Sequence, residues 1–143
     1  MKWLSFLIVS LLLSCGSTKE KINVSSSDPR DILKAVLGDV NQESDEYTIM
    51  DARIEKNILV LSIRYSGGCT STQGSLIGNQ NIMKSMPPKR SMKFILKKEG
   101  ACRKMNEEQF VIDIQDLAYK KEKGSEIILL LKGHDTPLHY IYY

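Results

Sequence analysis

Polar and apolar residues alternate with a period of two over much of the chain beyond residue 46, a pattern typical of strands that bury one face. Two such runs, residues 47–54 and 58–65, are separated only by Glu55-Lys56-Asn57, so they predict a β-hairpin. The side of the second run that would face a core carries Leu59, Leu61, Ile63 and Tyr65.

Further segments with the composition of strands cover residues 92–98, 109–114, 126–132 and 138–142. The run from Ile127 to Leu131 is apolar on both faces, which indicates a central strand covered on both sides. Residues 66–91 form an unusually long connection, within which residues 74–78 predict a short edge strand. The positions expected to face inward on two of these strands are Phe94, Leu96, Phe110, Ile112 and Ile114.

Residues 28–38 predict one short helix. Asp28 can cap its start, Pro29 suits the first turn and Gly38 can end it. An apolar stripe of Ile32, Leu33, Val36 and Leu37 would lie on the sheet. The whole pattern predicts a mainly β fold, a small antiparallel β-sandwich or flattened barrel of about six to seven strands with one short N-terminal helix.

The first 14 residues have the layout of a signal peptide, with one positive charge at Lys2 followed by an apolar run from Trp3 to Leu13. A helix that spans a bilayer needs about 20 apolar residues, so this run of about 11 is too short for one. The run ends in Leu-Leu-Ser-Cys-Gly at residues 12–16, which resembles the bacterial lipobox. We therefore expect cleavage before Cys15 and acylation of its thiol, an ordinary secretory signal being the alternative.

The polar residues 16–27 that follow Cys15 predict a flexible tether, so the lipidated cysteine and tether together cover residues 15–27. Residues 28–143 then form a single domain, which is long enough for one hydrophobic core. The expected location is the bacterial cell envelope, lipid-anchored at the outer membrane on its periplasmic or surface side.

Two cysteines, Cys69 and Cys102, remain once Cys15 is acylated, in a compartment that permits disulfides. Closing a loop of about 34 residues would stabilise the fold by about 3–4 kcal/mol on the chain-entropy model. Two buried free thiols are the alternative. The absence of a Cys-x-x-Cys motif disfavours a redox-active pair.

Charge is strongly segregated along the chain although the net charge is only +3. Residues 39–55 carry six acidic side chains and one basic one. Residues 84–104 carry one acidic side chain and eight basic ones, which are Lys84, Lys89, Arg90, Lys93, Lys97, Lys98, Arg103 and Lys104. These bases either form a surface that binds anions or a solvated face that pairs with the acidic segment, and the second interpretation is favoured.

Several motifs resemble a family of uncharacterised Bacteroidota lipoproteins. They are Tyr-Ser-Gly-Gly-Cys at 65–69, Leu-Ile-Gly at 76–78, Lys-Ser-Met-Pro-Pro at 84–88, Cys102, and the strand from Phe110 to Leu117. The resemblance covers about half of the mature domain and implies that the two cysteines are paired. That family also places histidines where this chain has residues 70–73 and 97–98, which contain none. A metal site of the relatives is therefore not expected here.

His134, Asp135 and His139 form the only grouping of histidine and carboxylate, and they are weak candidates for metal ligands. Their spacing fits no known ligand pattern, and Asp-Thr-Pro at 135–137 is ordinary turn chemistry, so no metal and no cofactor are expected. Gly67-Gly68 lacks the lysine of a phosphate-binding loop and more simply predicts a turn with positive φ.

No serine lies in a Gly-x-Ser-x-Gly elbow, and no catalytic residues are assigned. The leading hypothesis is a membrane-anchored lipoprotein with a non-enzymatic binding domain. Its expected partners are the membrane, through Cys15, and an anionic glycan, lipopolysaccharide or envelope protein, with no nucleic acid. The alternatives are a metal-dependent or hydrolytic envelope enzyme that uses His134 and His139, and a structural envelope protein.

Overall fold

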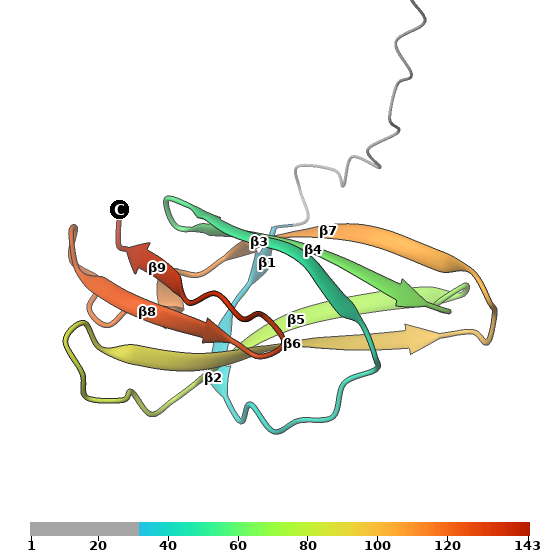
Figure 1. Cartoon of the computed structure of the whole chain (residues 1–143), viewed down its shortest axis with the longest axis horizontal. Coiled ribbons are helices and arrows are strands. Elements are labelled where there is room, and N and C mark those ends of the chain that lie inside the picture. The colour runs from blue at the N-terminus through green and yellow to red at the C-terminus, as the bar shows by residue number, and fades with distance from the viewer. Residues whose placement is uncertain (1–31) are drawn as a thin grey trace, which may run out of the picture.

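The structure, a computed structural model, describes residues 32–143. Its strands form two sheets that face each other across one core (Figure 1). Sheet A has the strand order β1-β7-β4-β3, and sheet B has the order β2-β5-β6-β8-β9. In chain order the elements are β1 (Leu33–Lys34), β2 (Val36–Gly38), β3 (Thr48–Glu55), β4 (Ile58–Ser66), β5 (Ser71–Asn79), β6 (Lys89–Glu99), β7 (Met105–Asp113), the 3-10 turn η1 (Gln115–Leu117), β8 (Glu126–Leu131) and β9 (Leu138–Ile141).

The predicted mainly β class is confirmed, and so is the hairpin of β3 and β4. These two strands pair in antiparallel register from Thr48 opposite Arg64 to Glu55 opposite Ile58. The two-residue turn between them contains Lys56, which has a positive φ of 58°. All four residues expected on the inner face of β4 are buried, which follows from the period-two alternation.

The core lies between the two sheets and is made of aliphatic residues with a central aromatic group. Phe94 on β6 and Phe110 on β7 lie with ring centroids 4.8 Å apart, so this pair joins sheet B to sheet A. Tyr47 packs edge-on against Phe94 at 5.7 Å. Fully buried residues from both sheets complete the core, among them Leu59, Leu61, Ile63, Leu76, Leu96, Ile112, Ile127 and Leu129.

Two tyrosine hydroxyls link the sheets by hydrogen bonds. Tyr47, just before β3, donates to the carbonyl oxygen of Phe94 on β6 at 2.7 Å. Tyr140 on β9 donates to Oδ1 of Asn57 in the β3–β4 turn at 2.9 Å. Burial raises the pKa of both Tyr47 and Tyr140 to about 12, because the charged phenolate would lose its hydration.

The prediction of a short helix over residues 28–38 is wrong for residues 32–38, which the structure describes. Residues 33–38 form β1 and β2, which pair in parallel with Ile112–Asp113 of β7 and Ile77–Asn79 of β5. Ala35 lies between them, fully buried, where the chain crosses from sheet A to sheet B. Pairing with distant strands overrides the local helix signals here. Residues 28–31 lie outside the described residues.

The sheets are mixed rather than purely antiparallel, because β1–β7, β2–β5 and β6–β8 are parallel pairs. Among residues 32–143 the two sheets stay separate and form no closed barrel, so the flattened-barrel alternative is wrong. The described part of the chain, residues 32–143, contains nine strand segments rather than the six or seven expected. The two segments beyond the expected seven are β1 and β2, which come from an N-terminal strand that is split between the sheets.

The short edge strand predicted at 74–78 is a nine-residue strand, β5, that pairs along its length with β6 and at one end with β2. The apolar run on β8 also differs from expectation. Ile127, Leu129 and Leu131 face the core, whereas Ile128 and Leu130 are only half-buried on the outer side of sheet B. This strand is central in the sheet but is covered fully on one face alone.

The predicted signal peptide at 1–14 and the lipidated Cys15 with its tether at 15–27 lie outside the described residues. Within residues 32–143, no helix is long and apolar enough to cross a membrane.

Candidate functional site

The outer face of sheet A carries charged side chains that pair with one another. Arg53 on β3 donates to Asp51 at 2.8 Å and to Glu55 at 3.0 Å. Arg64 on β4 donates through Nε to Glu107 on β7 at 2.8 Å. Because each of these bases has a carboxylate partner, this face has little net charge to offer a ligand.

The outer face of sheet B is different. Its lysines are Lys89, Lys93 and Lys97 on β6 and Lys132 just after β8. None of the four forms an ion pair with a carboxylate of residues 32–143. Between them lie the half-buried Ile128 and Leu130, because the register places Lys89 opposite Ile128 and Ser91 opposite Leu130. We call these six residues the lysine face.

The acidic segment after β2 runs along the outer side of sheet B before it enters β3, as Figure 1 shows beneath β6. The amide N–H of Asp45 donates to the carbonyl of Leu96 at 2.9 Å, and Oδ2 of Asp45 accepts from the amide N–H of Lys98 at 2.7 Å. Nζ of Lys93 donates to the carbonyl of Gln42. The acidic and basic segments therefore do meet, but through backbone groups rather than through lysine–carboxylate pairs.

This crossing segment and sheet B enclose a pocket of about 280 Å³. Lys93 and Lys132 contribute to its lining, as do the polar residues Asn41 and Ser91. Apolar lining comes from Val40 and Leu130, and the remaining contacts are Met92 and Leu131. Two lysines and several apolar residues thus contribute to the pocket, a combination that suits an acidic group attached to an apolar body.

The other predicted basic residues do not join the lysine face. Arg90 is 3% exposed and points inward, where Nε donates to the carbonyl of Leu117 at 3.0 Å and Nη1 donates to the carbonyl of Asn79. Burial lowers the pKa of Arg90. Lys84 is exposed in the β5–β6 connection, and Arg103 and Lys104 are exposed between β6 and β7. The basic stretch of the sequence is therefore split among several places in the fold.

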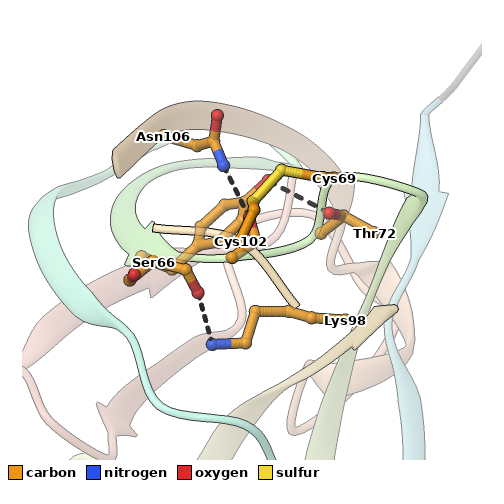
Figure 2. Close-up of a disulfide and its surroundings, with 8 residues drawn as sticks. Ser66, Cys69, Thr72, Lys98, Cys102 and Asn106 are labelled. Carbon is orange, nitrogen blue, oxygen red and sulfur yellow. Dashed lines mark hydrogen bonds between the residues drawn. A yellow bond between two sulfur atoms is a disulfide. The ribbon is translucent and has the colours of Figure 1, made fainter. Parts of the chain in front are cut away.

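The predicted disulfide is confirmed. Cys69 and Cys102 are bonded, with a sequence separation of 33 residues, and they join the β4–β5 and β6–β7 connections at one end of the molecule (Figure 2). Both connections pass between the sheets, so the bond fastens sheet A to sheet B at this end. Gly67 and Gly68 have φ of 91° and 74°, in line with the predicted turn.

Polar side chains line the interior beside the disulfide. Tyr65 donates to Oε2 of Glu108 at 2.7 Å and lies 3.2 Å from Oγ1 of Thr72. Lys98 donates to the carbonyl of Ser66 at 2.8 Å, and Asn106 donates to that of Gly67 at 2.7 Å (Figure 2). Burial raises the pKa of Tyr65, so this hydroxyl stays protonated and acts as a donor that closes the end of the core.

The two histidines lie on the β8–β9 hairpin, each with a local partner. Nε2 of His139 lies 3.4 Å from Oε2 of Glu126, across the strand pair. Nδ1 of His134 accepts the amide N–H of Thr136 at 3.3 Å in the turn that also contains Asp135. In the part of the chain that the structure describes, no three side chains of the metal-binding types converge.

The sequence alone did not predict that Ile128, Leu130 and Lys132 lie on one face with Lys89. Lys132 follows Ile128 and Leu130 at intervals of two, so the alternation did place the three on the same side. The missing information was the parallel pairing of β8 with β6, which brings residues about 40 positions apart beside each other.

No protein-family model matches this chain, and no curated protein matches its sequence. Solved structures do share its fold. A NigD-like immunity protein from Bacteroides caccae aligns with a TM-score of 0.58 and 7% identity, over 77% of this chain and 64% of its own. A DUF1344 protein of unknown function from Bacteroides vulgatus aligns with a TM-score of 0.53 and 13% identity, over 78% and 56% respectively. This chain thus spans less than two thirds of either relative, and at such low identities the similarity shows the fold alone.

Proposed function

We propose that this chain is a lipid-anchored protein of the bacterial cell envelope whose β domain binds an acidic protein through the lysine face, without catalysing a reaction. The signal-peptide layout and the lipobox at Cys15 support the anchor. The resemblance to Bacteroidota lipoproteins and the Bacteroides origin of both structural neighbours support membership of that group. The neighbour described as an immunity protein supports a role other than catalysis.

The observation that carries the proposal is the set of lysines near Ile128 and Leu130 that have no carboxylate partner among residues 32–143. Protein interfaces combine an apolar centre with a polar rim, and the half-buried aliphatic pair has lysines beside it on β6 and after it at Lys132. A polyanionic glycan or lipopolysaccharide headgroup would use the lysines but not the aliphatic centre. An acidic protein surface uses both.

No contact of the described residues favours the enzyme alternative. His134 and His139 each have a local partner, and the nearest carboxylate to His139 is Glu126 on the same hairpin. The pocket beside Lys93 contains no histidine, cysteine or carboxylate in its lining. The binding function is therefore favoured over the enzyme alternative.

The experiment uses the full chain in its host membrane, with a photo-crosslinking amino acid in place of Lys132. The matched control has the same amino acid in place of Gln109, which is exposed on the outer face of sheet A. We expect the position on sheet B to capture one acidic envelope protein and the control to capture none. Equal capture from both faces, or capture of lipopolysaccharide in place of a protein, would contradict the proposal.

Binding of the captured partner by the purified full chain should weaken as salt rises from roughly 0.05 M to 0.3 M, because salt screens exposed charges. An affinity that stays constant over this range would remove the electrostatic part of the proposal. The aliphatic part is tested by Leu130→Ser, which should weaken binding at every salt concentration without changing the salt dependence.

A further inference from the structure

The side of the molecule formed by β5 and β7 has two sheet edges that the neighbouring strands cover only in part. β2 pairs with β5 at Ile77–Asn79, and β1 pairs with β7 at Ile112–Asp113. Within residues 32–143, no strand pairs with residues 71–76 of β5 or with residues 105–111 of β7 on this side. Each of these stretches therefore presents backbone N–H and C=O groups that no strand of the described chain satisfies.

Exposed sheet edges pair readily with other strands, and proteins protect them with charged side chains, bulges or very short strands. β3, the outer strand of sheet A, has an irregularity between Ile49 and Asp51 and carries charged residues. β9, the outer strand of sheet B, has only four residues. The open part of β7 carries Glu107 and Glu108.

The open part of β5 has none of these protections. Residues 71–76 read Ser-Thr-Gln-Gly-Ser-Leu, without charge or proline, and they pair with β6 in continuous register. At the centre, a side chain on Gly74 would place its Cβ 2.5 Å from Phe94 and 2.8 Å from Phe110, so glycine lets this strand lie close to the aromatic pair. The edge consequently has no bulge, no charge and no side chain at its middle residue.

We propose that residues 71–76 of β5 pair with the same residues of a second copy of this chain, in antiparallel orientation about a two-fold axis. A self-paired strand places each side chain opposite one from the same segment, and because this segment is uncharged no like charges meet. The contact is isologous and closed, which is the commonest arrangement of homodimers. The open stretch of β7 would instead bring Glu107 and Glu108 close to the same two residues of the second copy.

The dimer has a consequence for the lysine face. The two-fold axis of an antiparallel strand pair is perpendicular to the sheet, so two five-stranded B sheets would continue into one sheet with both outer faces on the same side. Two lysine faces would then act side by side on one partner or on two adjacent ones, which raises avidity. The dimer itself rests on the edge of β5 and does not depend on the proposed function.

The experiment measures sedimentation velocity of the full chain in mild detergent, from micromolar to tens of micromolar concentration. Gln73→Lys/Ser75→Lys adds two charges at exposed positions of the edge. The matched control, Gln80→Lys/Asn81→Lys, adds the same two charges at exposed positions just beyond the strand. We expect a wild-type dimer, a dissociation constant at least tenfold higher in the edge variant, and an unchanged dimer in the control.

A wild-type chain that sediments as a monomer at every concentration would overturn the proposal. So would a dimer that survives Gln73→Lys/Ser75→Lys. A dimer that dissociates with Gln109→Lys on β7 but not with the β5 variant would also overturn it, because the interface would then lie on the other edge. Partner binding is measured separately with changes on the lysine face, so failure of one proposal is distinguishable from failure of the other.

Discussion

The outer faces of the two sheets both carry basic residues but balance them differently. On sheet A, Arg64 lies directly opposite Glu107 in the pairing of β4 with β7. On sheet B, Lys97 lies opposite Gln73 and Lys93 lies opposite Ile77. Alternation along each strand decides only that these side chains point outward. The register between strands decides whether a base meets an acid, and the proposed binding of an acidic partner rests on this difference.

The largest effect is expected from breaking the disulfide that fastens the two sheets at one end. Cys69→Ser/Cys102→Ser should lower the free energy of unfolding by about 3–4 kcal/mol, because the closed loop restricts the unfolded chain. Urea denaturation measures this. Wild-type protein under reducing conditions is the control and should lose the same amount. A loss below about 1 kcal/mol would show that the sheets hold their positions without the bond.

Arg90 and Lys89 are adjacent in sequence but lie on opposite faces of β6, which makes them a matched pair. Arg90→Met should cost about 2–3 kcal/mol of stability, because the buried carbonyls of Leu117 and Asn79 lose their donor. Lys89→Met, at an exposed position, should change stability by less than about 0.5 kcal/mol. Equal effects of the two changes in urea denaturation would contradict the inward placement of Arg90.

The two tyrosine hydroxyls that join the sheets predict a loss of stability in alkali. An unfolded tyrosine ionises near pH 10, whereas Tyr47 and Tyr140 hold their protons to about pH 12 in the fold. The folded state therefore binds more protons in this range, and stability that is complete below pH 10 falls as the pH rises towards 12. Unfolding midpoints measured from pH 8 to 11.5 should decline above pH 10, and less steeply in Tyr47→Phe. A flat profile would contradict the burial of these hydroxyls.

Charge reversal at two places tests whether the partner binds the lysine face or responds to basic residues anywhere in the basic stretch of the sequence. Lys89→Glu/Lys132→Glu should weaken binding of the captured partner about tenfold, a change of about 1.4 kcal/mol. Arg103→Glu/Lys104→Glu changes the net charge equally, but at the disulfide end, and should leave affinity nearly unchanged. Equal weakening by both variants in a binding titration would mean that overall charge, rather than this face, attracts the partner.

The smallest effect is expected on sheet A. Arg64→Ala removes an exposed cross-strand ion pair with Glu107 and should cost less than about 1 kcal/mol of stability. It should not change binding, because this face already has its charges paired. Weaker binding in Arg64→Ala, measured in the same titration, would indicate that the partner contacts sheet A.

Sequence patterns predicted the strands whose inner faces are strongly apolar. Leu61 and Ile63 on β4 and Phe94 on β6 fall where alternation placed them, because a buried face leaves a clear period in the sequence. Only residues 74–78 of the polar strand β5 were predicted. Its residues Ser71 to Ser75 lie on a partly open edge, so little burial constrains their composition.

Local signals failed at the N-terminal segment for a different reason. Ile32, Leu33, Val36 and Leu37 fit a helical stripe, yet Leu33 pairs with Ile112 and Val36 with Ile77. Such long-range parallel pairing has no signature within the segment itself. The same limitation concealed the link between Lys132 and β6, since it depends on which strands become neighbours.

The central claim is that the outer face of sheet B contacts the partner. Lysine-selective footprinting by mass spectrometry, on the native protein in its membrane and again after extraction from its partner, measures this directly. The account predicts that Lys89, Lys97 and Lys132 are protected in the membrane and become reactive on extraction, whereas Lys104 and Lys123 react equally in both states. Protection of Lys104 or Lys123 instead, with the lysine face reactive throughout, would contradict it.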